Sequence, residues 1–418
     1  MAAYKVVTLL ASGFFMALVA IAIHRPSLYF MSACCLSVFV VAYAATRLSL
    51  GSLSWSRRTG DRVFDGDPVG VEIRLTNRSR VPKFLVTVED TLSPWLETET
   101  APRFLIPVLW PGQEVAVSYE ARARRRGLME LGPLQVTSGD PLGILTQRRS
   151  FPAMSQALIY PRPVELAGWE TGGRELYGSL ISRESTAARE GLEFHGVRDY
   201  QAGDDLKHIH WKATARHGRL RVIEFESDPS PEATLILDLE QGTEVGQDID
   251  TTLEYGVKIA ASLASHAVHT GGRVSFEARD GRQRYHLEVS RLDQLFELYE
   301  LLALVKADGP EPVSRLALEA ARDIRPGSSL TVITAALTPA LAEQVYQLLP
   351  RRVVVEVILL EASTFDGRLA PSRAAQEQME ALAGQLESAG ARVILVRRGD
   401  SLREVLTGGD GIARGYAG

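Results

Sequence analysis

The stretch that decides the organisation of this chain is VVTLLASGFFMALVAIAIHRPSLYFMSACCLSVFVVAYAA, residues 6–45. It contains two runs without charge, Val6–Ile23 and Leu28–Ala45, separated by the tetrapeptide His24-Arg25-Pro26-Ser27. A bilayer core needs roughly 20 apolar residues in a helix, with about 17 as the lower limit. A link this short forces the two helices to run antiparallel. Residues 1–50 are therefore predicted to form a transmembrane hairpin with spans at about 6–23 and 28–45.

Basic residues near the two runs predict the orientation. They are Lys5 before the first run, Arg25 in the link, and Arg47, Arg57 and Arg58 after the second. The positive-inside tendency then places both termini and the bulk of the chain in the cytoplasm, beneath the inner or plasma membrane, as a multi-pass protein. The alternative is a cleaved signal peptide, because Ala20-Ile21-Ala22 resembles a cleavage site. The second run would then remain as an anchor.

Composition excludes several kinds of chemistry. The 418 residues carry 46 Lys and Arg against 51 Asp and Glu, a balance of −5, which argues against binding nucleic acid along the whole chain. The two cysteines are Cys34 and Cys35, both inside the second apolar run. Residues 60–418 therefore hold no thiol nucleophile, thiolate zinc site or iron–sulfur cluster.

Residues 60–160 are predicted to form a β-sandwich of immunoglobulin-like size. Val69–Leu75 alternates with period two, Phe84–Val88 and Glu114–Tyr119 are further strands, and Pro111-Gly112 is a turn. The densest basic cluster follows, at Arg122 and Arg124–Arg126. It is interpreted as a solvated strand face and turn, with contact to anionic lipid headgroups as the alternative.

The segment GLEFHGVRDYQAGDDLKHIHWKATARHGRLRVIEFE, residues 191–226, is polar and dense in His, Arg and Asp. The candidate residues for a partner-binding or structural motif are Arg198, Tyr200, Gly203, Asp204, Asp205, His210, Trp211 and Arg216. Leu220–Phe225 reads as a strand. The favoured interpretation is a buried ion-pair network with Trp211 as a packing anchor, since buried charges need partners.

Three alternatives remain for this segment. One is a direct partner-binding surface. Another is a metal site of His195, His208 and His210 beside the aspartates, although a His-x-His pair on a helix points its rings apart. The third is an acid–base pair of Asp205 and His210 in a hydrolase.

This segment resembles the signature of the domain of unknown function 58 family. The matching steps are Arg198–Asp204, Ile209-His210-Trp211 and Thr214-Ala215-Arg216, with two upstream phrases, Gly139–Ile144 and Ile159–Pro163. The resemblance implies a module like a von Willebrand factor type A domain. It also implies association with MoxR-type AAA+ ATPases and, often, with transglutaminase-like membrane proteins. It implies no established activity.

The signature region spans residues 161–228, and residues 229–407 are predicted to form a doubly wound α/β domain. Ala233–Asp238, Leu330–Ala335, Val353–Leu360 and Arg392–Val396 are apolar strands of the kind that parallel sheets bury, and helical stretches separate them. Asp280-Gly281 predicts a hairpin between Arg273–Ala278 and Arg284–Val289. Residues 408–418 form a Gly-rich tail.

The type A likeness implies a Mg²⁺ site whose first strand ends in Asp-x-Ser-x-Ser. Here Asp238 keeps the aspartate, but Glu240 and Gly242 stand where the serines belong, and Thr334-Ala335-Ala336 supplies no acidic residue. We therefore predict a degenerate site with no metal and no cofactor.

The sequence thus predicts a non-enzymatic membrane scaffold or adaptor that contacts the lipid bilayer and binds a protein partner, expected to be a MoxR-type AAA+ ATPase, and no nucleic acid. The alternatives are a hydrolase using the His- and Asp-rich segment and a Mg²⁺-dependent adhesion module. A channel or transporter is disfavoured because neither apolar run contains a charge.

Overall fold

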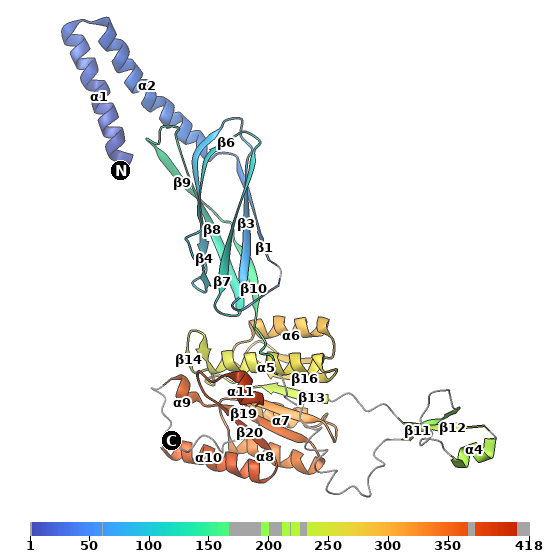
Figure 1. Cartoon of the computed structure of the whole chain (residues 1–418). Helices are drawn as coiled ribbons and strands as arrows, with labels where there is room; N and C mark the ends of the chain where they lie inside the picture. The colour runs from blue at the N-terminus through green and yellow to red at the C-terminus, as the bar shows by residue number, and fades with distance from the viewer. Residues whose placement is uncertain are drawn as a thin grey trace. The chain divides into compact units, whose positions relative to one another are not determined.

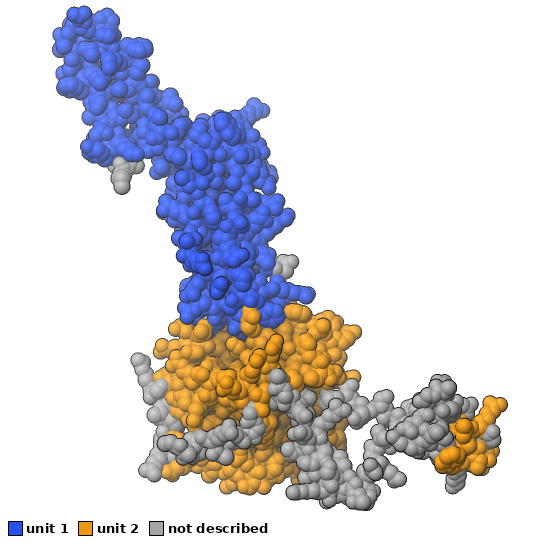
Figure 2. All heavy atoms as spheres, in the orientation of Figure 1, with its two compact units in different colours: residues 1–161 blue, residues 162–418 orange. Residues whose placement is uncertain are grey.

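The computed structural model describes residues 2–60, 62–166, 194–199, 211–217, 219–225, 232–366 and 373–407. The chain forms two compact units, residues 1–161 and 162–418 (Figure 2). Each is treated separately below.

Unit 1 begins with two apolar helices, α1 (Ala2–Ile23) and α2 (Pro26–Ser49), which run antiparallel (Figure 1). Both are strongly apolar, and little of the most apolar part of either helix is buried in the protein. Both are long and apolar enough to cross a bilayer, and a signal sequence near the N-terminus would have the same character. They pack closely: the Ser32 hydroxyl donates to the Gly13 carbonyl at 2.8 Å, and a Cβ at Gly13 would lie 2.9 Å from Leu36.

The rest of unit 1 is a β-sandwich. One sheet has the order β1-β3-β7-β5 and the other β2-β10-β8-β4-β6, with β9 also paired to β8. The strands are β1 (Leu53–Thr59), β2 (Val63–Phe64), β3 (Pro68–Asn77), β4 (Lys83–Leu92), β5 (Leu96–Glu97), β6 (Arg103–Leu109), β7 (Glu114–Ala123), β8 (Gly127–Gly139), β9 (Thr146–Phe151) and β10 (Ser155–Tyr160). The alternating runs of the sequence form β3, β4 and β7, and their inward side chains build one core.

The sandwich begins earlier than the sequence indicated. Residues 53–59 already pair with β3 in the strand β1, ahead of the expected start at Gly60. Arg57 in β1 is buried, where it forms an ion pair with Asp90 and donates to the carbonyls of Leu131 and Ala153 at 2.8 and 2.6 Å. Burial raises the pKa of Asp90, although Tyr119 and Arg57 both counteract this. Arg57 is thus an internal cation and does not belong among the charges flanking the apolar helices.

A buried lysine joins α2 to the sandwich. The Lys83 side chain, at the start of β4, is wholly buried, and its ammonium donates to the carbonyls of Ser49 and Gly51 at 2.6 Å each and of Leu48 at 3.5 Å. The last carbonyls of a helix have no partner within the helix, and a cation there also interacts favourably with the helix dipole. Burial lowers the pKa of Lys83. Leu50, which follows α2, is part of the sandwich core.

The basic cluster of β7 and the turn after it lies at the opposite end of the sandwich, because Arg122 pairs with Pro68 and Ala123 with Leu96. Arg124 forms an ion pair with Glu97 at 2.8 Å, and the Arg125 guanidinium lies 5.3 Å from the centre of the Trp95 ring. These contacts favour the interpretation as a strand face and turn, but Arg126 is buried and does not belong to a solvated face.

Unit 2 contains a six-stranded sheet of order β17-β16-β13-β18-β19-β20. Its strands are β13 (Glu232–Leu237), β16 (Arg273–Arg279), β17 (Arg284–Val289), β18 (Ser329–Thr334), β19 (Val354–Leu360) and β20 (Arg392–Val396). All neighbours are parallel except β16 and β17, which form the predicted hairpin. Asp280 fixes that turn by accepting from the amides of Arg282 and Gln283.

Helices cover both faces of this sheet (Figure 1). They are α5 (Thr252–His269), α6 (Leu292–Leu304), α7 (Val313–Ala320), α8 (Pro339–Leu348), α9 (Ala362–Phe365), α10 (Arg373–Ser388) and α11 (Leu402–Thr407), with a 3₁₀ turn η2 (Leu349–Arg351) and the short strands β14 (Gly246–Gln247) and β15 (Asp250–Thr251). Gly256 of α5 approaches Leu237 and Ile333 on one face. On the other face, Ile236 packs with the core of α7, α8 and α10.

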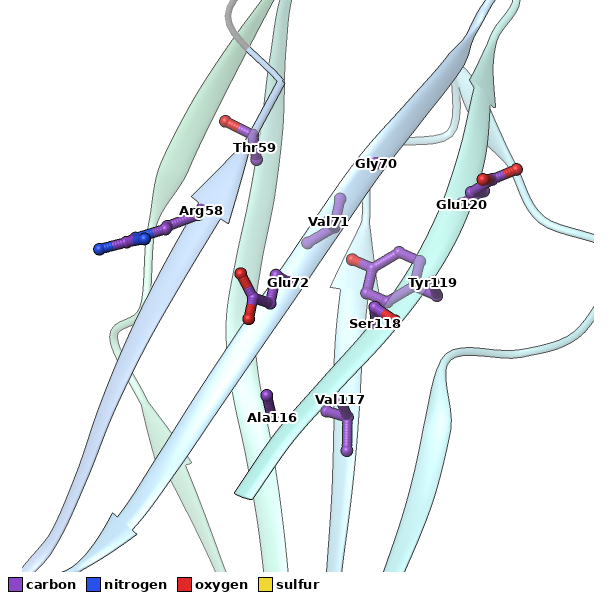
Figure 3. Close-up of a pocket in the computed structure, with 10 residues that line it drawn as sticks. All are labelled: Arg58, Thr59, Gly70, Val71, Glu72, Ala116, Val117, Ser118, Tyr119 and Glu120. Carbon is purple, nitrogen blue, oxygen red and sulfur yellow. The ribbon is translucent and has the colours of Figure 1, made fainter. Parts of the chain in front are cut away.

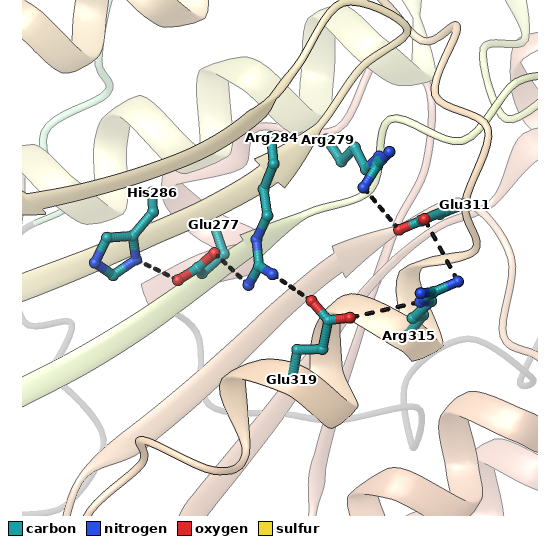
Figure 4. Close-up of polar contacts among 7 residues, drawn as sticks. All are labelled: Glu277, Arg279, Arg284, His286, Glu311, Arg315 and Glu319. Atoms are coloured by element: carbon teal, nitrogen blue, oxygen red, sulfur yellow. Dashed lines mark hydrogen bonds and ion pairs between the residues drawn. The ribbon is translucent and has the colours of Figure 1, made fainter.

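A chain of ion pairs fastens the edge hairpin to α7 (Figure 4). Glu277 contacts both His286 and Arg284, and Arg284 also pairs with Glu319 of α7. Arg315 continues the chain from Glu319 toward Glu311. Charges along an edge strand also hinder pairing with another chain.

We predict that Lys83→Met destabilises unit 1. The methionine fills the space but leaves the carbonyls of Ser49 and Gly51 without their buried donor, which costs on the order of 2 kcal/mol. The measurement is the unfolding of the full chain in detergent, with Arg103→Met, at an exposed position of β6, as the control. A stability equal to that of the control would contradict the assigned role of Lys83.

Candidate functional site

The signature segment is described only in part. Residues 194–199 form β11 (Phe194–Asp199), which pairs antiparallel with β12 (Arg221–Phe225), so the strand predicted at 220–225 is confirmed. Between them lies the short helix α4 (Trp211–His217), which is tied to β12 because the Arg221 amide donates to the Thr214 hydroxyl at 3.0 Å. The backbone of Arg198 lies in β11. The candidates outside the described residues are Tyr200, Gly203, Asp204, Asp205 and His210.

The two described side chains of this motif face solvent. Trp211 is 68 % exposed, and Arg216 is exposed as well. The expectation that Trp211 serves as a buried packing anchor is therefore wrong. The reason is local: α4 is only seven residues long, too short to cover a ring of this size with its own side chains. The predicted ion-pair network and the two alternatives, a metal site and an acid–base pair, each include residues outside the described ranges and stay hypotheses.

The second candidate lies at the carboxyl edge of the six-stranded sheet. Asp238 directly follows β13, and Thr334 ends the neighbouring strand β18. The chain leaves β13 for β16 on one side and returns to β18 on the other, so this is the point where the strand order reverses. Ligands of open α/β sheets bind in the crevice at such a point. The position of Asp238 is the one that the sequence predicted.

Both carboxylate oxygens of Asp238 are bound by the protein itself. Oδ1 accepts from the Glu240 amide at 3.0 Å, and Oδ2 accepts from the Thr334 hydroxyl at 2.7 Å. Thr334 also receives a hydrogen bond from the Ala336 amide at 2.9 Å, which closes a small network. Burial raises the pKa of Asp238, and these two hydrogen bonds counteract the shift. The carboxylate therefore holds the loop after β13 against the end of β18 through these hydrogen bonds.

Glu240 and Gly242 continue this loop. The backbone of Glu240 forms an isolated bridge with Gly309, and Gln241 donates to the Gly309 carbonyl at 2.9 Å. Burial and the nearby Asp238 both raise the pKa of Glu240. Gly242 has a φ of +93°, a conformation that glycine adopts without strain. Within the described ranges, no cluster of three His, Cys, Asp or Glu side chains lies close enough to hold a metal ion.

The space beside Asp238 is small. A cavity of about 10 Å³ is lined by Asp238, Thr243, Thr252 and Thr334, among others. That volume holds about one water molecule. Two of the hydroxyls are already used within the protein, since Thr252 donates to the Thr243 carbonyl and Thr243 to the Glu240 carbonyl, both at 2.7 Å. This cavity is therefore too small for a small-molecule substrate.

Unit 1 carries a larger hollow that the sequence did not indicate. An open groove of about 660 Å³ crosses the outer face of β1, β3 and β7 (Figure 3). Its floor contains the small residues Gly70, Ala116 and Ser118, and Arg58 and Glu72 lie on paired strands beside them. The available signal was small side chains at the outward positions of the alternating strands. None of the predicted site residues lines this groove.

We predict that Asp238→Asn stabilises the sheet edge at neutral and alkaline pH. Asparagine removes the buried charge: its Oδ1 still accepts from the Glu240 amide, and its Nδ2 donates to the Thr334 hydroxyl, which turns to donate to the Ala336 carbonyl 3.1 Å away. Because the pKa of Asp238 is raised by folding, the wild-type edge loses stability as pH rises from about 4 through the raised pKa. The advantage of the variant therefore grows over that window and vanishes in acid. The difference in stability between the variant and the wild type is measured at each pH by hydrogen exchange of the β13 and β18 amides, corrected for intrinsic exchange rates.

The matched control is Asp323→Asn, at an exposed carboxylate of the same unit. It should show no gain that grows with pH. A loss of protection in Asp238→Asn at pH 8 would contradict the predicted stabilisation and would show that the two hydrogen bonds to the carboxylate outweigh the cost of its buried charge. Protection of the wild type by Mg²⁺ that disappears in Asp238→Asn would instead reveal a cation site.

Comparison with known proteins identifies relatives of the same region. Residues 196–364 match the family described as "Protein of unknown function DUF58". The family resemblance of the signature segment is thus confirmed over that range, which includes residues 196–199 of β11, α4 and the Asp238 edge. The chain is also 25 % identical over 260 residues to the "Uncharacterized protein YeaD" of Bacillus subtilis (strain 168). That alignment covers 61 % of this chain and 62 % of the relative.

Solved structures give only weak likenesses. A Salmonella alpha-2-macroglobulin is 19 % identical with a TM-score of 0.21, over 27 % of this chain and 7 % of that one. The CARDB domain of PF1109 from Pyrococcus furiosus is 12 % identical with a TM-score of 0.19, over 26 % of this chain and 94 % of that one. A Clostridium perfringens cohesin module is 11 % identical with a TM-score of 0.19, over 27 % of this chain and 98 % of that one. At these scores the likenesses support no conclusion. What the comparisons establish is that residues 196–364 of this chain are similar to the DUF58 family.

Proposed function

We propose that this chain is a membrane-anchored scaffold or adaptor that binds a protein partner through the α4 segment. The observation that carries the proposal is the exposure of Trp211 on α4, with the exposed Arg216 five residues along the same short helix. Tryptophan and arginine are enriched among the residues that dominate binding energy at protein interfaces. An exposed tryptophan within the range that matches the family is best explained as a contact for a partner.

The Asp238 edge supports a binding role without a metal. Its carboxylate is bound on both oxygens by the protein, and its cavity has room for about one water. The strand order and the position of Asp238 support a degenerate type A module. A Mg²⁺-dependent adhesion module and a hydrolase remain the alternatives, and neither gains support from the described residues.

The partner and the location are proposed together. The family resemblance favours a MoxR-type AAA+ ATPase as partner, with a transglutaminase-like membrane protein as a further member of the assembly. Two apolar helices and the basic residues Lys5, Arg47 and Arg58 favour a multi-pass anchor whose soluble part lies in the cytoplasm. Arg57 is excluded from this charge count because it is buried with Asp90.

We predict that Trp211→Ala lowers recovery of the ATPase partner, in affinity purification of the full chain from membranes, by at least about tenfold, as loss of a dominant interface contact does. The matched control is Leu292→Ala, which removes a large apolar side chain of similar exposure (56 %) from α6 of unit 2. Equal recovery with both variants would contradict the role of α4. Recovery lost equally with both would point to a general defect in the protein.

A further inference from the structure

Three loops gather at the end of the sandwich into which α2 leads. They are residues 78–82 between β3 and β4, residues 110–113 between β6 and β7, and residues 140–145 between β8 and β9. The strand registers place them together: Leu53, the first residue of β1, pairs with Asn77, Lys83 pairs with Leu109, and Gly139 pairs with Thr146. The same Lys83 holds the carbonyls at the end of α2. We call this the α2 end of the sandwich.

Asn77 fastens the first two loops to each other. Its buried side-chain amide donates to the carbonyls of Val81 and Leu109, each at 2.9 Å. Its backbone carbonyl accepts from the Gly112 amide at 2.7 Å. The loop that carries Val81 and the loop that carries Trp110 are therefore built as one surface.

The third loop is the phrase Gly139-Asp140-Pro141-Leu142-Gly143-Ile144 of the sequence analysis. Asp140 is buried, and its carboxylate accepts from the amides of Leu142 and Leu145 at 2.8 and 2.6 Å. Gly143 has a φ of +64°, which side chains rarely adopt. Its carbonyl accepts from the Lys5 ammonium, at the start of α1, at 3.3 Å. This loop thus has a fixed shape, and it lies beside the beginning of α1.

Large apolar side chains stand exposed on these rigid loops. Leu142 is 65 % exposed, Trp110 is 59 % exposed, and Val81 is exposed beside them. The basic residues Arg78 and Arg80 in the first loop are also exposed. Tryptophan at the boundary between lipid and water, with arginine at headgroup level, is the composition of a membrane-contacting surface.

We propose that the α2 end of the sandwich rests on anionic phospholipid headgroups, with Leu142 and Trp110 entering the interface and Arg78 and Arg80 contacting lipid phosphates. This inference rests on the proposed membrane anchorage, because the hairpin brings the surface to the bilayer. Lipid is the expected ligand because both apolar helices contact this end of the sandwich. Lys5 of α1 donates to the Gly143 carbonyl, and Lys83 of β4 donates to the Ser49 carbonyl at the end of α2. The basic cluster of residues 122–126 is excluded from this role because it lies at the other end.

The test uses the full chain with Cys34 and Cys35 replaced by serine and one fluorescent label on a new cysteine. Leu142→Cys reports on the α2 end, and Leu128→Cys, an exposed leucine at the start of β8, is the matched control at the opposite end. Phe15→Cys reports on α1. The protein is reconstituted in vesicles of phosphatidylglycerol and phosphatidylcholine in equal parts, with a quencher on either the headgroup or the acyl chain.

Headgroup quencher should reduce fluorescence at position 142 several-fold more than at position 128, and acyl-chain quencher should act at position 15. Quenching at 142 should weaken in pure phosphatidylcholine and in the double variant Arg78→Gln/Arg80→Gln, but not in Arg103→Gln. If the label at position 15 is quenched but the label at position 142 is quenched no more than the label at position 128, the proposed contact of the α2 end with headgroups is wrong. The proposed membrane anchorage is then still supported. If position 15 is also unquenched, the anchorage itself fails. Equal quenching at 142 in both lipid mixtures would overturn the preference for anionic headgroups.

Discussion

The interaction on which unit 1 depends is the buried ammonium of Lys83 against the last carbonyls of α2. An apolar helix that ends at a soluble domain presents backbone oxygens without partners, and burying them without a donor is costly. Lys83 meets this requirement from the first position of β4, so an interior strand of the sandwich supplies the donor for the end of the helix. The chain then enters β1, where a second buried cation, the Arg57 guanidinium, forms an ion pair with Asp90. Lys83 therefore fixes the end of α2 to the sandwich, and Arg57 fixes the first strand after it.

Unit 2 uses a buried carboxylate in a comparable way. Asp238 stands where open α/β sheets bind ligands, yet its oxygens are taken by an amide of its own loop and by the hydroxyl that ends the next strand. A position suited to a ligand is thereby turned into a support for the loop after β13. The features left for recognition are surfaces: the exposed Trp211 of α4, the open groove on β1, β3 and β7, and the apolar loops at the α2 end.

Much of the fold could be predicted because its signals are local. Alternation in Val69–Leu75 and the Asp280-Gly281 turn are properties of short segments, and the structure contains the strand and the hairpin they predict. The position of Asp238 followed from the apolar run before it. The errors concern residues whose environment is set from far along the chain. Arg57 reads as a juxtamembrane charge until Asp90, 33 residues later, is known to lie against it. The role of Lys83 likewise depends on tertiary packing that no periodicity reveals. The exposure of Trp211 is a separate case with a local cause, the shortness of α4.

The central claim is that Lys83 ties α2 to the sandwich, and a distance measurement tests it most directly. Spin labels on cysteines introduced at the exposed positions Tyr43 of α2 and Leu105 of β6, in the chain without Cys34 and Cys35, report the separation of helix and sandwich in vesicles. The account predicts a narrow distribution of distances in the parent chain and in Arg103→Met, and a broad one in Lys83→Met. An equally narrow distribution in Lys83→Met would contradict it.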